Sequence, residues 1–461
     1  MRTSSGATLL TEGSIWKKLI GFAIPLFLGN LFQQLYNTAD SLIVGNFIGS
    51  EALAAVSSSG SLIFLMVGLF NGIAMGAGVV IARYFGAQDR ENLGRAVHAT
   101  VFFGIVAGII LTVVGIALTP LLLRWMGTPE EVLPNSVLYF RVYFAGILAV
   151  ILYNIAVGIL QAVGDSRHPL YYLIISSCVN VVLDLLFVAV LDLGVGAAAL
   201  ATSLSQCLSA VLAFRRLCRA DADYRVIWKQ VRFDSPMLRQ ILRIGLPSGL
   251  QNSIISFANV IVQASINQFG PDAMAGCGVY FKIEGFGFLP ITCFAMALST
   301  FVSQNLGAEK YDRVQKGARF GVLCSMAIAE VVGVAVRLLA PWLMAAFNRA
   351  PEVIAFGVNQ AEIETLFWFL LALSHCMAGV LRGAGKSKVP MLVMMVCWCI
   401  IRISYITITL HLLPDIRVVF WAYPITWTLS SIAFFIYYHR ADWLHGGRLS
   451  DMAGRAKAKQ G

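Results

Sequence analysis

Charged side chains are scarce in this sequence, and their scarcity limits what the protein can be. Lys, Arg, Asp and Glu make up 13% of the 461 residues, whereas an ordinary soluble domain contains roughly 25%. Hydrophobic residues account for 58%, and no polar stretch between the apolar segments is long enough to fold as a separate soluble domain. The composition therefore indicates a polytopic membrane protein.

The sequence also lacks the short motifs of common catalytic and nucleotide-binding sites. It contains no GxxxxGK[ST], HExxH, GxSxG or CxxC pattern, and its nine cysteines have neither disulfide nor zinc spacing. We therefore expect neither an enzyme nor a bound cofactor. ATP could drive this protein only through another subunit.

Apolar runs of membrane-spanning length recur along most of the chain. A run of about 20 residues covers a hydrocarbon core of about 30 Å at a rise of about 1.5 Å per residue. Together with breaker residues, these runs predict about twelve helices, over residues 16–43, 52–83, 94–119, 136–160, 169–190, 195–218, 237–267, 275–304, 315–340, 354–381, 389–411 and 416–438. The sequence thus predicts an all-α membrane protein.

Positive charges collect in every second loop. The net charge is +10, yet the intervening loops carry chiefly Arg124, Arg349 and Arg417. This is the positive-inside pattern, which predicts that both termini and the basic loops are cytoplasmic. The basic surplus is then explained by topology and by attraction to anionic lipid head groups, rather than by nucleic acid.

The second half of the chain repeats the first at an offset of about 221 residues. The recurring segments are Gly86-Ala87 with Gly307-Ala308, Gly158 to Pro169 with Gly379 to Pro390, and, at an offset of 222, Pro25 with Pro247. Because each copy holds an even number of spans, an axis along the membrane normal should relate the copies. The repeat predicts two pseudo-symmetric six-helix lobes, residues 1–218 and 237–438, with a cytoplasmic linker at 219–236 and a basic cytoplasmic tail at 439–461.

The first apolar segment carries a polar face. Gln33, Asn37 and Asp40 fall at i, i+4 and i+7, with Tyr36 beside them. A carboxylate at membrane depth is costly, so its default interpretation is functional, as part of an ion, proton or substrate path. The alternative is an Asp40 that serves only as an interhelical hydrogen-bonding group. Pro25, about four turns earlier, removes a backbone hydrogen bond and predicts a bend in this helix.

A second intramembrane acid lies in the fifth predicted helix. Asn180 and Asp184 share one face, Thr202 follows on the sixth helix, and apolar residues flank Asp184. If Asp40 and Asp184 approach one another, repulsion and desolvation favour protonation of one acid, so that the pair could load protons. The same oxygens, with Asn180 and Thr202, could equally form a Na⁺ site, because hard cations prefer oxygen ligands. The residues alone leave the ion open.

The second half does not repeat these acids. Tyr405 stands at the position of Asp184, and aliphatic residues stand at that of Asp40. Other ionisable residues that we predict to be buried in its apolar segments are Lys282, Glu284, Glu330, Glu362, Glu364, His375 and Arg402. His375 repeats Asn154 and is a candidate for a polar lining of the second lobe. For the glutamates at 330, 362 and 364, interfacial snorkelling or a local partner is the alternative to a functional role.

In their order and spacing, these residues resemble the multidrug and toxic compound extrusion (MATE) family, over the span from Trp16 to Tyr438. The resemblance rests on Asn37-Thr-Ala-Asp40 with Val44-Gly45, on Gly86-Ala87, on Gly158-Ile-Leu-Gln-Ala-Val-Gly164-Asp-Ser, on Asn180 with Asp184, and on Gly379-Val-Leu-Arg-Gly-Ala-Gly385-Lys-Ser. It implies the MATE fold, alternating access, and a multi-pass transporter of the bacterial inner membrane. Such a transporter exports amphipathic, often cationic, organic compounds by H⁺ or Na⁺ antiport.

Within that family, the chain resembles the DinF-like bacterial branch, which uses first-lobe acids. The positions here that match its ion-coupling residues are Asp40, Asn180, Asp184 and Thr202, with Asn154 nearby. To the substrate cavity or its gate we assign Pro25, Gln33, Tyr36, Asn37, Glu284 and His375. Another branch places coupling acids on helix seven, where this chain has none between Leu246 and Phe269.

Three other functions stay open. A lipid-linked oligosaccharide flippase of the same superfamily would share the duplicated helices, but we expect it to carry several cavity cations, for which only Lys282 and Arg402 are candidates. A membrane-embedded enzyme would share the aspartates but lacks a nucleophile motif here, and a channel would give far faster flux. The partners that we expect are small organic substrates and the lipid bilayer, with no nucleic acid, no obligatory protein partner and no cofactor beyond the coupling ion.

Overall fold

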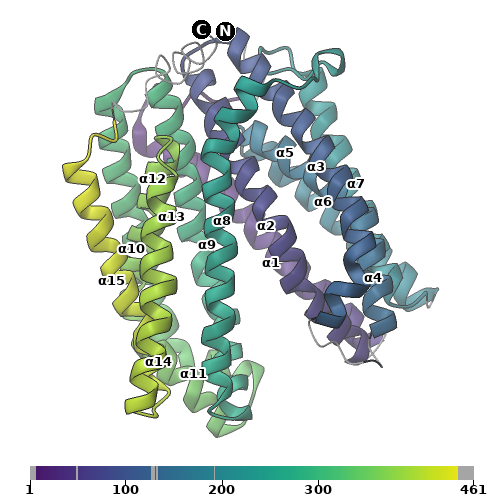
Figure 1. Cartoon of the computed structure of the whole chain (residues 1–461), viewed down its shortest axis with the longest axis vertical. Coiled ribbons are helices and arrows are strands. Elements are labelled where there is room, and N and C mark those ends of the chain that lie inside the picture. The colour runs from purple at the N-terminus through teal and green to yellow at the C-terminus, as the bar shows by residue number, and fades with distance from the viewer. Residues whose placement is uncertain (1–6, 48–49, 126–129, 131–132, 192, 445–461) are drawn as a thin grey trace. The chain divides into compact units, whose positions relative to one another are not determined.

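Every regular element in the part of the chain that the structure describes is a helix. A computed structural model describes the backbone of residues 7–47, 50–125, 130, 133–191 and 193–444, and its side-chain description leaves out residues 39–67, 125, 189 and 195. The first half contains α1 (Ile15–Phe47), α2 (Ser50–Gly86), α3 (Arg90–Trp125), α4 (Leu133–Ala145), α5 (Ile147–Ala162), α6 (Arg167–Asp184), the π-helical η1 (Leu185–Val190) and α7 (Val195–Arg219). These helices are labelled in Figure 1.

The second half repeats this order after a short 3₁₀ turn, η2 (Trp228–Gln230). It contains α8 (Ser235–Asn267), α9 (Pro271–Gly307), α10 (Tyr311–Phe347), α11 (Pro351–Glu364), the 3₁₀ turn η3 (Thr365–Phe367), α12 (Trp368–Gly383), α13 (Lys388–Met394), the π-helical η4 (Met395–Ile401), α14 (Arg402–Leu412) and α15 (Arg417–Arg440).

The membrane-spanning segments follow the predicted pattern. Among the described residues, ten segments are long and apolar enough to cross a membrane, and the pair α4 and α5, bent by 47° at Gly146, makes an eleventh. The 33-residue helix α8 is long enough to be a twelfth, although its composition does not place it among those segments. Gln251, Asn252 and Asn259 contribute to the difference, because each lowers the hydropathy of the central part of the helix.

The chain folds into two units that exchange short segments. One unit consists of Met1–Leu9 and Ile24–Gly245, and the other of Leu10–Ala23 and Leu246–Gly461. Helices α1 and α8 therefore each begin in one unit and end in the other. In both helices the change of unit comes one residue before a proline, Pro25 or Pro247. Because proline lacks the amide that would bond the preceding turn, each helix is weakest at this point.

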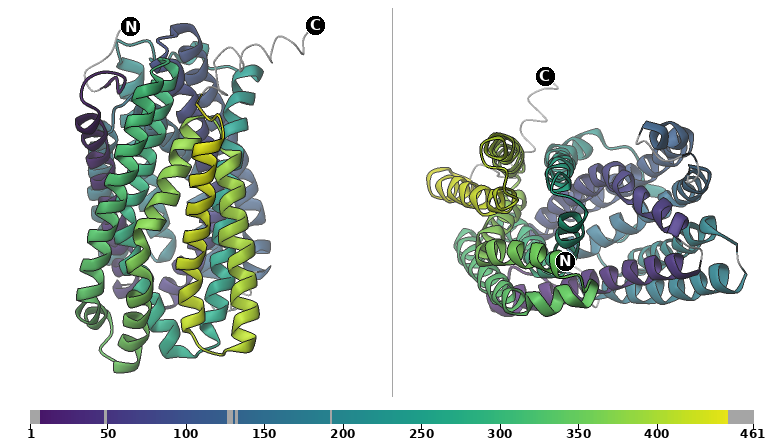
Figure 2. Two further views of the ribbon diagram at one scale, coloured as in Figure 1. Left: turned by 90° about the vertical axis from the view of Figure 1, so that its left-hand side faces the viewer. Right: turned by 90° about the horizontal axis from the view of Figure 1, so that it is seen from below.

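In the first unit, α5 lies between several neighbours. It packs against α2, α3 and α7, while α6 packs against α7; Figure 2 draws these helices in purple to teal in two further views. Helix α2 also meets the start of α8, where Gly76 faces Gly245 so closely that an added Cβ would collide with backbone. Small residues thus allow the two backbones to approach, as is common between membrane helices.

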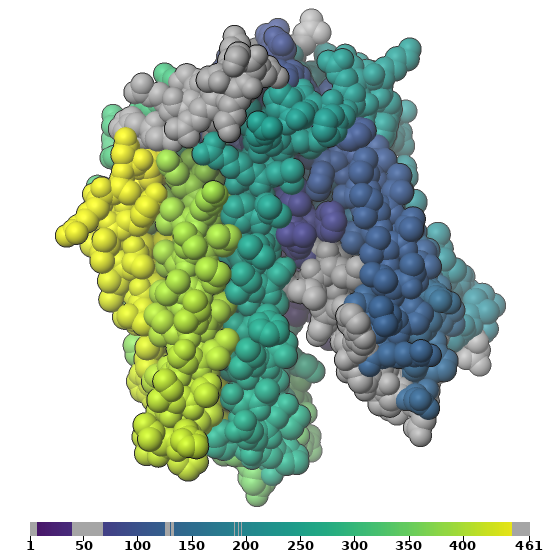
Figure 3. All heavy atoms as spheres, viewed as in Figure 1, coloured from purple at the N-terminus to yellow at the C-terminus, as the bar shows by residue number. Residues whose placement is uncertain are grey.

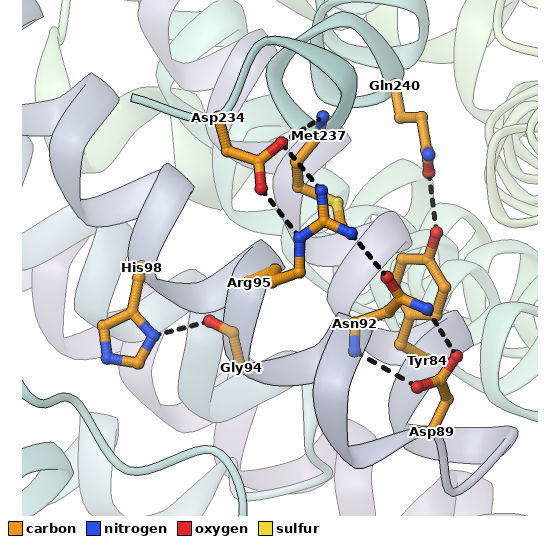
Figure 4. Close-up of polar contacts among 9 residues, drawn as sticks. All are labelled: Tyr84, Asp89, Asn92, Gly94, Arg95, His98, Asp234, Met237 and Gln240. Atoms are coloured by element: carbon orange, nitrogen blue, oxygen red, sulfur yellow. Dashed lines mark hydrogen bonds and ion pairs between the residues drawn. The ribbon is translucent and has the colours of Figure 1, made fainter. Parts of the chain in front are cut away.

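The start of α8 is fixed to the first unit by polar contacts, drawn in Figure 4. Arg95 Nε and Nη2 donate to the two carboxylate oxygens of Asp234 at 2.8 and 3.2 Å, and Asp234 Oδ1 accepts from the Met237 amide at 3.1 Å. Tyr84 donates to Gln240 at 3.0 Å. These hydrogen bonds connect the segment that enters α8 to the end of α2 and the start of α3.

The second unit is built around α9. This helix packs against α10, α11 and α12, and α15 packs against α11, α12 and α14; Figure 3 shows the surfaces of α14 and α15 next to one another. Trp368 and Trp427 are the largest fully buried side chains. The segment before α1 also belongs to this unit, because Arg313 donates to the carbonyls of Leu10 and Gly13 at 3.1 and 2.7 Å.

Candidate functional site

Asp184 lies in a buried polar cluster of the first unit. Its side chain and that of Asn180 are fully buried, and both stand on the last turns of α6. When the Asn180 amide is oriented to satisfy both of its neighbours, its nitrogen donates to Asp184 Oδ2 at 2.8 Å and its oxygen accepts from the Thr202 amide at 3.2 Å. The structure therefore brings three of the predicted ion-coupling residues together.

Asp184 lies at a change of helix type and beside an apolar shell. The α-helix ends at Asp184 and continues as the π-helix η1, a wider turn that is frequent at functional sites. Val181, Phe187 and Val188 pack against Ala197–Ala199 on α7 and form an apolar shell beside the acid. A charge in such a shell is costly unless a proton, a cation or hydrogen bonds compensate it.

Thr202 contributes one oxygen to the cluster. Its hydroxyl donates to the Ala198 carbonyl of its own helix at 3.1 Å, which leaves lone pairs of the same oxygen facing α6. The oxygens of Asp184, Asn180 and Thr202 are the kind of ligand that hard cations prefer. Among the described residues, no group of three or more His, Cys, Asp or Glu side chains gathers as in a transition-metal site.

The predicted polar face of α1 is described only in part. Asp40 lies within α1, but its side chain falls outside the described residues, so its predicted role stays a prediction. Gln33 and Tyr36 are half-buried and Asn37 is exposed. Pro25 lies inside the helix as predicted, directly after the residue at which α1 changes unit.

Asn154, predicted to lie near the ion-coupling residues, stands on α5 of the first unit. Its side chain is half-buried and lines a small cavity of about 10 Å³ between α2, α3 and α5, together with Asn71 and Thr100. A space of this size is close to that needed by a single water molecule. We therefore expect Asn154 to hold a water within the first unit.

The second unit has a buried polar cluster of its own. Glu364 is fully buried at the end of α11, and Gln360 Nε2 donates to its Oε1 at 2.8 Å. Arg402 is 2% exposed and lies close enough to Glu364 and Glu284 for their charges to interact. Its Nη2 and Nε donate to Thr426 Oγ1 at 3.0 and 3.3 Å.

Arg402 is also held by aromatic rings. Its guanidinium carbon lies 4.4 Å from the ring centre of Tyr423 and 5.5 Å from that of Trp398. Both distances are within the range of a cation–π contact. The neutral hydroxyl of Thr426 and two ring faces thus solvate this buried cation, while Glu284 and Glu364 supply the opposite charge.

His375 and Glu284, both predicted to belong to the substrate cavity or its gate, lie in different surroundings. The His375 ring lies between Phe288 and Trp398, with ring centres 4.8 and 5.2 Å away. Glu284 is half-buried and faces the charge of Arg402. The two residues are therefore connected through Trp398 and Arg402, which contact one another.

The prediction that Lys282 and Glu362 are buried is wrong. Lys282 is exposed, with its ammonium 6.0 Å from the Phe347 ring centre, and Glu362 is exposed with its backbone carbonyl accepting from Arg337. The reason is helical geometry: residues two apart point in different directions, so Glu364 is buried while Glu362 is not. Gln360 was not predicted as a site residue, although it stands four residues before Glu364 on the same face.

Both halves of the chain thus fold into bundles of membrane-spanning helices with a buried polar cluster and no catalytic constellation among the described residues. Duplicated bundles of membrane-spanning helices are the architecture of many secondary transporters. The MatE family model matches residues 25–186 and again residues 247–408, together well over half of the chain. The chain therefore belongs to the MATE family of transporters, and the two matches confirm the internal repeat.

Individual relatives agree with this assignment. The chain is 26% identical over 436 residues to the probable multidrug resistance protein YoeA of Bacillus subtilis, covering 93% of this chain and 94% of that protein. It is 28% identical over 393 residues to the probable multidrug resistance protein NorM of Thermotoga maritima, covering 82% of each.

Solved structures share the fold. An outward-facing multidrug resistance MATE family transporter of the MOP superfamily superposes with a TM-score of 0.89 at 24% identity, covering 96% of this chain and all of that chain. A MOP superfamily transporter from Pyrococcus furiosus superposes with a TM-score of 0.89 at 23% identity, covering all of both chains. These likenesses confirm the predicted all-α MATE fold.

Proposed function

We propose that this protein is a secondary active exporter of amphipathic, often cationic, organic compounds, driven by inward flow of H⁺ or Na⁺. The observation that carries the proposal is the Asn180–Asp184–Thr202 cluster, a buried carboxylate with oxygen-rich neighbours in an apolar bundle. The substrate class is supported by relatives that are named multidrug resistance or multidrug export proteins.

Ion binding would drive the cycle through alternating access. A ligand shifts a conformational equilibrium only if it prefers one state, so the ion and the organic compound must favour different conformations. Neutralising Asp184 changes the charge inside the apolar shell formed with α7, and such a change could favour a different packing of α6 and η1. Asp40, whose position on α1 matches the family, is the second acid that we assign to this step.

We assign the protein to the bacterial inner membrane with both termini in the cytoplasm. The support is the distribution of basic residues, which crowd the segments on the side of both termini. A fluorescent protein fused after Gly461 should fold and fluoresce, whereas an alkaline phosphatase fusion at the same position should be inactive. An active phosphatase fusion would reverse the assigned orientation.

The experiment that tests the function is dye efflux from proteoliposomes with an imposed ΔpH or ΔNa⁺. We expect wild-type protein to respond to one of the two gradients and Asp184→Asn to lose that response, because the amide cannot release a proton or neutralise a cation. Asp40→Asn should behave in the same way. Tyr405→Phe is the matched control, since it removes a polar group at the repeated position without touching the cluster.

The possible outcomes separate the alternatives. Gradient-driven transport by Asp184→Asn at the wild-type rate would refute the role of Asp184. Dye efflux that depends on neither the ΔpH nor the ΔNa⁺ would refute secondary active transport. Equal loss of transport in Tyr405→Phe would indicate general damage to the fold, which size-exclusion chromatography of the same samples checks.

A further inference from the structure

The first unit carries a groove on its outer face that the proposed transport cycle does not use. Its volume is about 730 Å³, and it lies between α4 and α5 on one side and α7 on the other. The α7 side runs from Leu200 through Leu204 and Val211 to Phe214, all of which line the groove. The fourteen helical steps from Leu200 to Phe214 correspond to about 21 Å. This is somewhat more than the depth of one leaflet, which is about half of a 30 Å hydrocarbon core.

The walls of this groove offer hydrocarbon and almost no hydrogen bonds. Ser203 is one of its few polar lining residues, and its hydroxyl donates to the Ala199 carbonyl of its own helix at 2.8 Å. Leu200, Leu204 and Val211 are 42%, 45% and 58% exposed. A polar or strongly charged compound would gain nothing from this surface, whereas an acyl chain would.

One end of the groove is closed by an aromatic pair beneath a basic rim. Trp228, from η2, stacks on Phe214 with ring centres 5.5 Å apart, and it is still 54% exposed. Exposed tryptophan is typical of the level of lipid head groups. Between residues 215 and 232 the chain holds six cations, Arg215, Arg216, Arg219, Arg225, Lys229 and Arg232, against two acids, Asp221 and Asp223.

Several of these cations are available to an external anion. Arg215, Arg219, Arg225 and Lys229 are exposed, and within the described part of the chain no ion pair engages them. Asp223 is already used, because Arg90 lies 3.4 Å from it. A cluster of cations directly beyond a membrane helix attracts anionic lipid, to which each Lys or Arg contributes.

We infer that this groove is a binding site for one anionic phospholipid, with an acyl chain along α7 and the phosphate at Arg225 and Lys229 above Trp228. Three features together support this assignment. They are an apolar groove of acyl-chain length, an interfacial tryptophan at its end, and exposed cations around that end. The site faces the leaflet on the side of the linker between the halves of the chain. Of the described residues that line the groove, Arg141 is the one that is charged, and it lies at the other end. A phosphate bound to Arg141 would reverse the orientation of the lipid, so the experiment must exclude this arrangement.

Native mass spectrometry of the purified full-length protein, titrated with phosphatidylglycerol and separately with phosphatidylcholine, tests the site. We expect Arg225→Gln/Lys229→Gln to weaken phosphatidylglycerol binding about thirtyfold, in line with the loss of two interfacial cations, and to weaken phosphatidylcholine binding less, because its choline offsets the charge of the phosphate. Leu204→Trp, which fills the groove, should reduce binding of both lipids. The matched controls are Lys316→Gln/Lys388→Gln, two exposed cations of the other unit, and Val331→Trp on the exposed face of α10.

Each contrary result overturns a defined part of the inference. Equal losses in the control cation pair would indicate unspecific attraction, and full binding by Leu204→Trp would refute the groove. Loss in Arg141→Gln, with none in the linker variant, would place the head group at the other end. If the native mass spectra show a dimer in which the groove is covered, this face binds a second copy of the chain instead of a lipid. Variants enter the comparison only if they elute as monodisperse protein.

Discussion

Two carboxylates among the described residues are fully buried at membrane depth, and their neighbours differ. Asp184 is bonded by the amide of Asn180 and lies beside alanines and valines of the first unit. Glu364 shares its surroundings with Gln360 and the guanidinium of Arg402. The first environment offers oxygens to a small cation or proton, whereas the second already contains a positive charge. This contrast supports the proposal that the coupling ion binds in the first unit.

Thr202→Val distinguishes the two coupling ions. A Na⁺ ion that uses the threonine oxygen would lose a ligand, so the Na⁺ concentration for half-maximal dye efflux should rise at least tenfold, or about 1.4 kcal/mol. A proton needs only the carboxylate, so H⁺-driven efflux should change less than twofold. Thr112→Val, which removes a hydroxyl bonded to Gly108 in the same unit, is the control and should change neither. Equal losses in both variants would contradict a local role.

Arg402→Leu should destabilise the second unit. It leaves Glu364 buried without its counter-charge, which typically costs roughly 3–5 kcal/mol, and we expect a marked fall in Tm by thermal unfolding in detergent. The double variant Arg402→Leu/Glu364→Gln should recover part of that loss, because both charges are then gone. Arg417→Leu, an exposed arginine at the start of α15, should be close to wild type. A double variant no more stable than the single one would refute the charge interaction.

At the scale of elements, the contact between α2 and the start of α8 depends on the absence of side chains. An added Cβ on Gly76 would meet the backbone of Gly245, which cannot yield as a flexible side chain can. We expect Gly76→Ala to lower stability by about 1–3 kcal/mol, measured as Tm in detergent. Gly278→Ala on α9 is the control, because nothing lies within 4 Å of the position that its added methyl group would take. A Tm unchanged in Gly76→Ala would show that the helices separate at little cost.

Pro247 should matter for transport more than for stability. It lies one residue beyond the point at which α8 changes unit, as Pro25 does in α1. Alanine restores the missing amide and stiffens the helix, so we expect Pro247→Ala to slow gradient-driven efflux severalfold with little change in Tm. Pro341→Ala is the control, because the whole of α10 lies within one unit. Wild-type efflux by Pro247→Ala would exclude a hinge at this residue.

At the scale of the molecule, the exchange of segments should hold the two halves together after cleavage. Residues 235–245 of α8 belong to the first unit, and residues 10–23 belong to the second. A protease site inserted after Ala222 should therefore yield fragments that co-purify in mild detergent, and separate only in SDS. Independent elution of the fragments in mild detergent would contradict this exchange.

The fold was largely predictable, and the sites only in part. The repeat and the succession of membrane-spanning helices follow from apolar runs and recurring glycines, which are visible residue by residue. The contact of Asn180 with Asp184 was expected because a spacing of four places both on one helix face. The burial of Glu364 with Arg402, and the exposure of Lys282, depend on which face of α9, α11 and α14 meets another helix.

The sequence by itself determined that this chain is a duplicated helical membrane protein of the MATE family. Composition, charge alternation and repeated motifs are properties of segments, and the membrane selects helices for any such segment because backbone polar groups must be satisfied internally. Only the tertiary structure decided which polar residues share a cluster, where α1 and α8 change unit, and that a groove ends beneath Trp228. These features arise from contacts between residues far apart in the chain, and no local pattern encodes them.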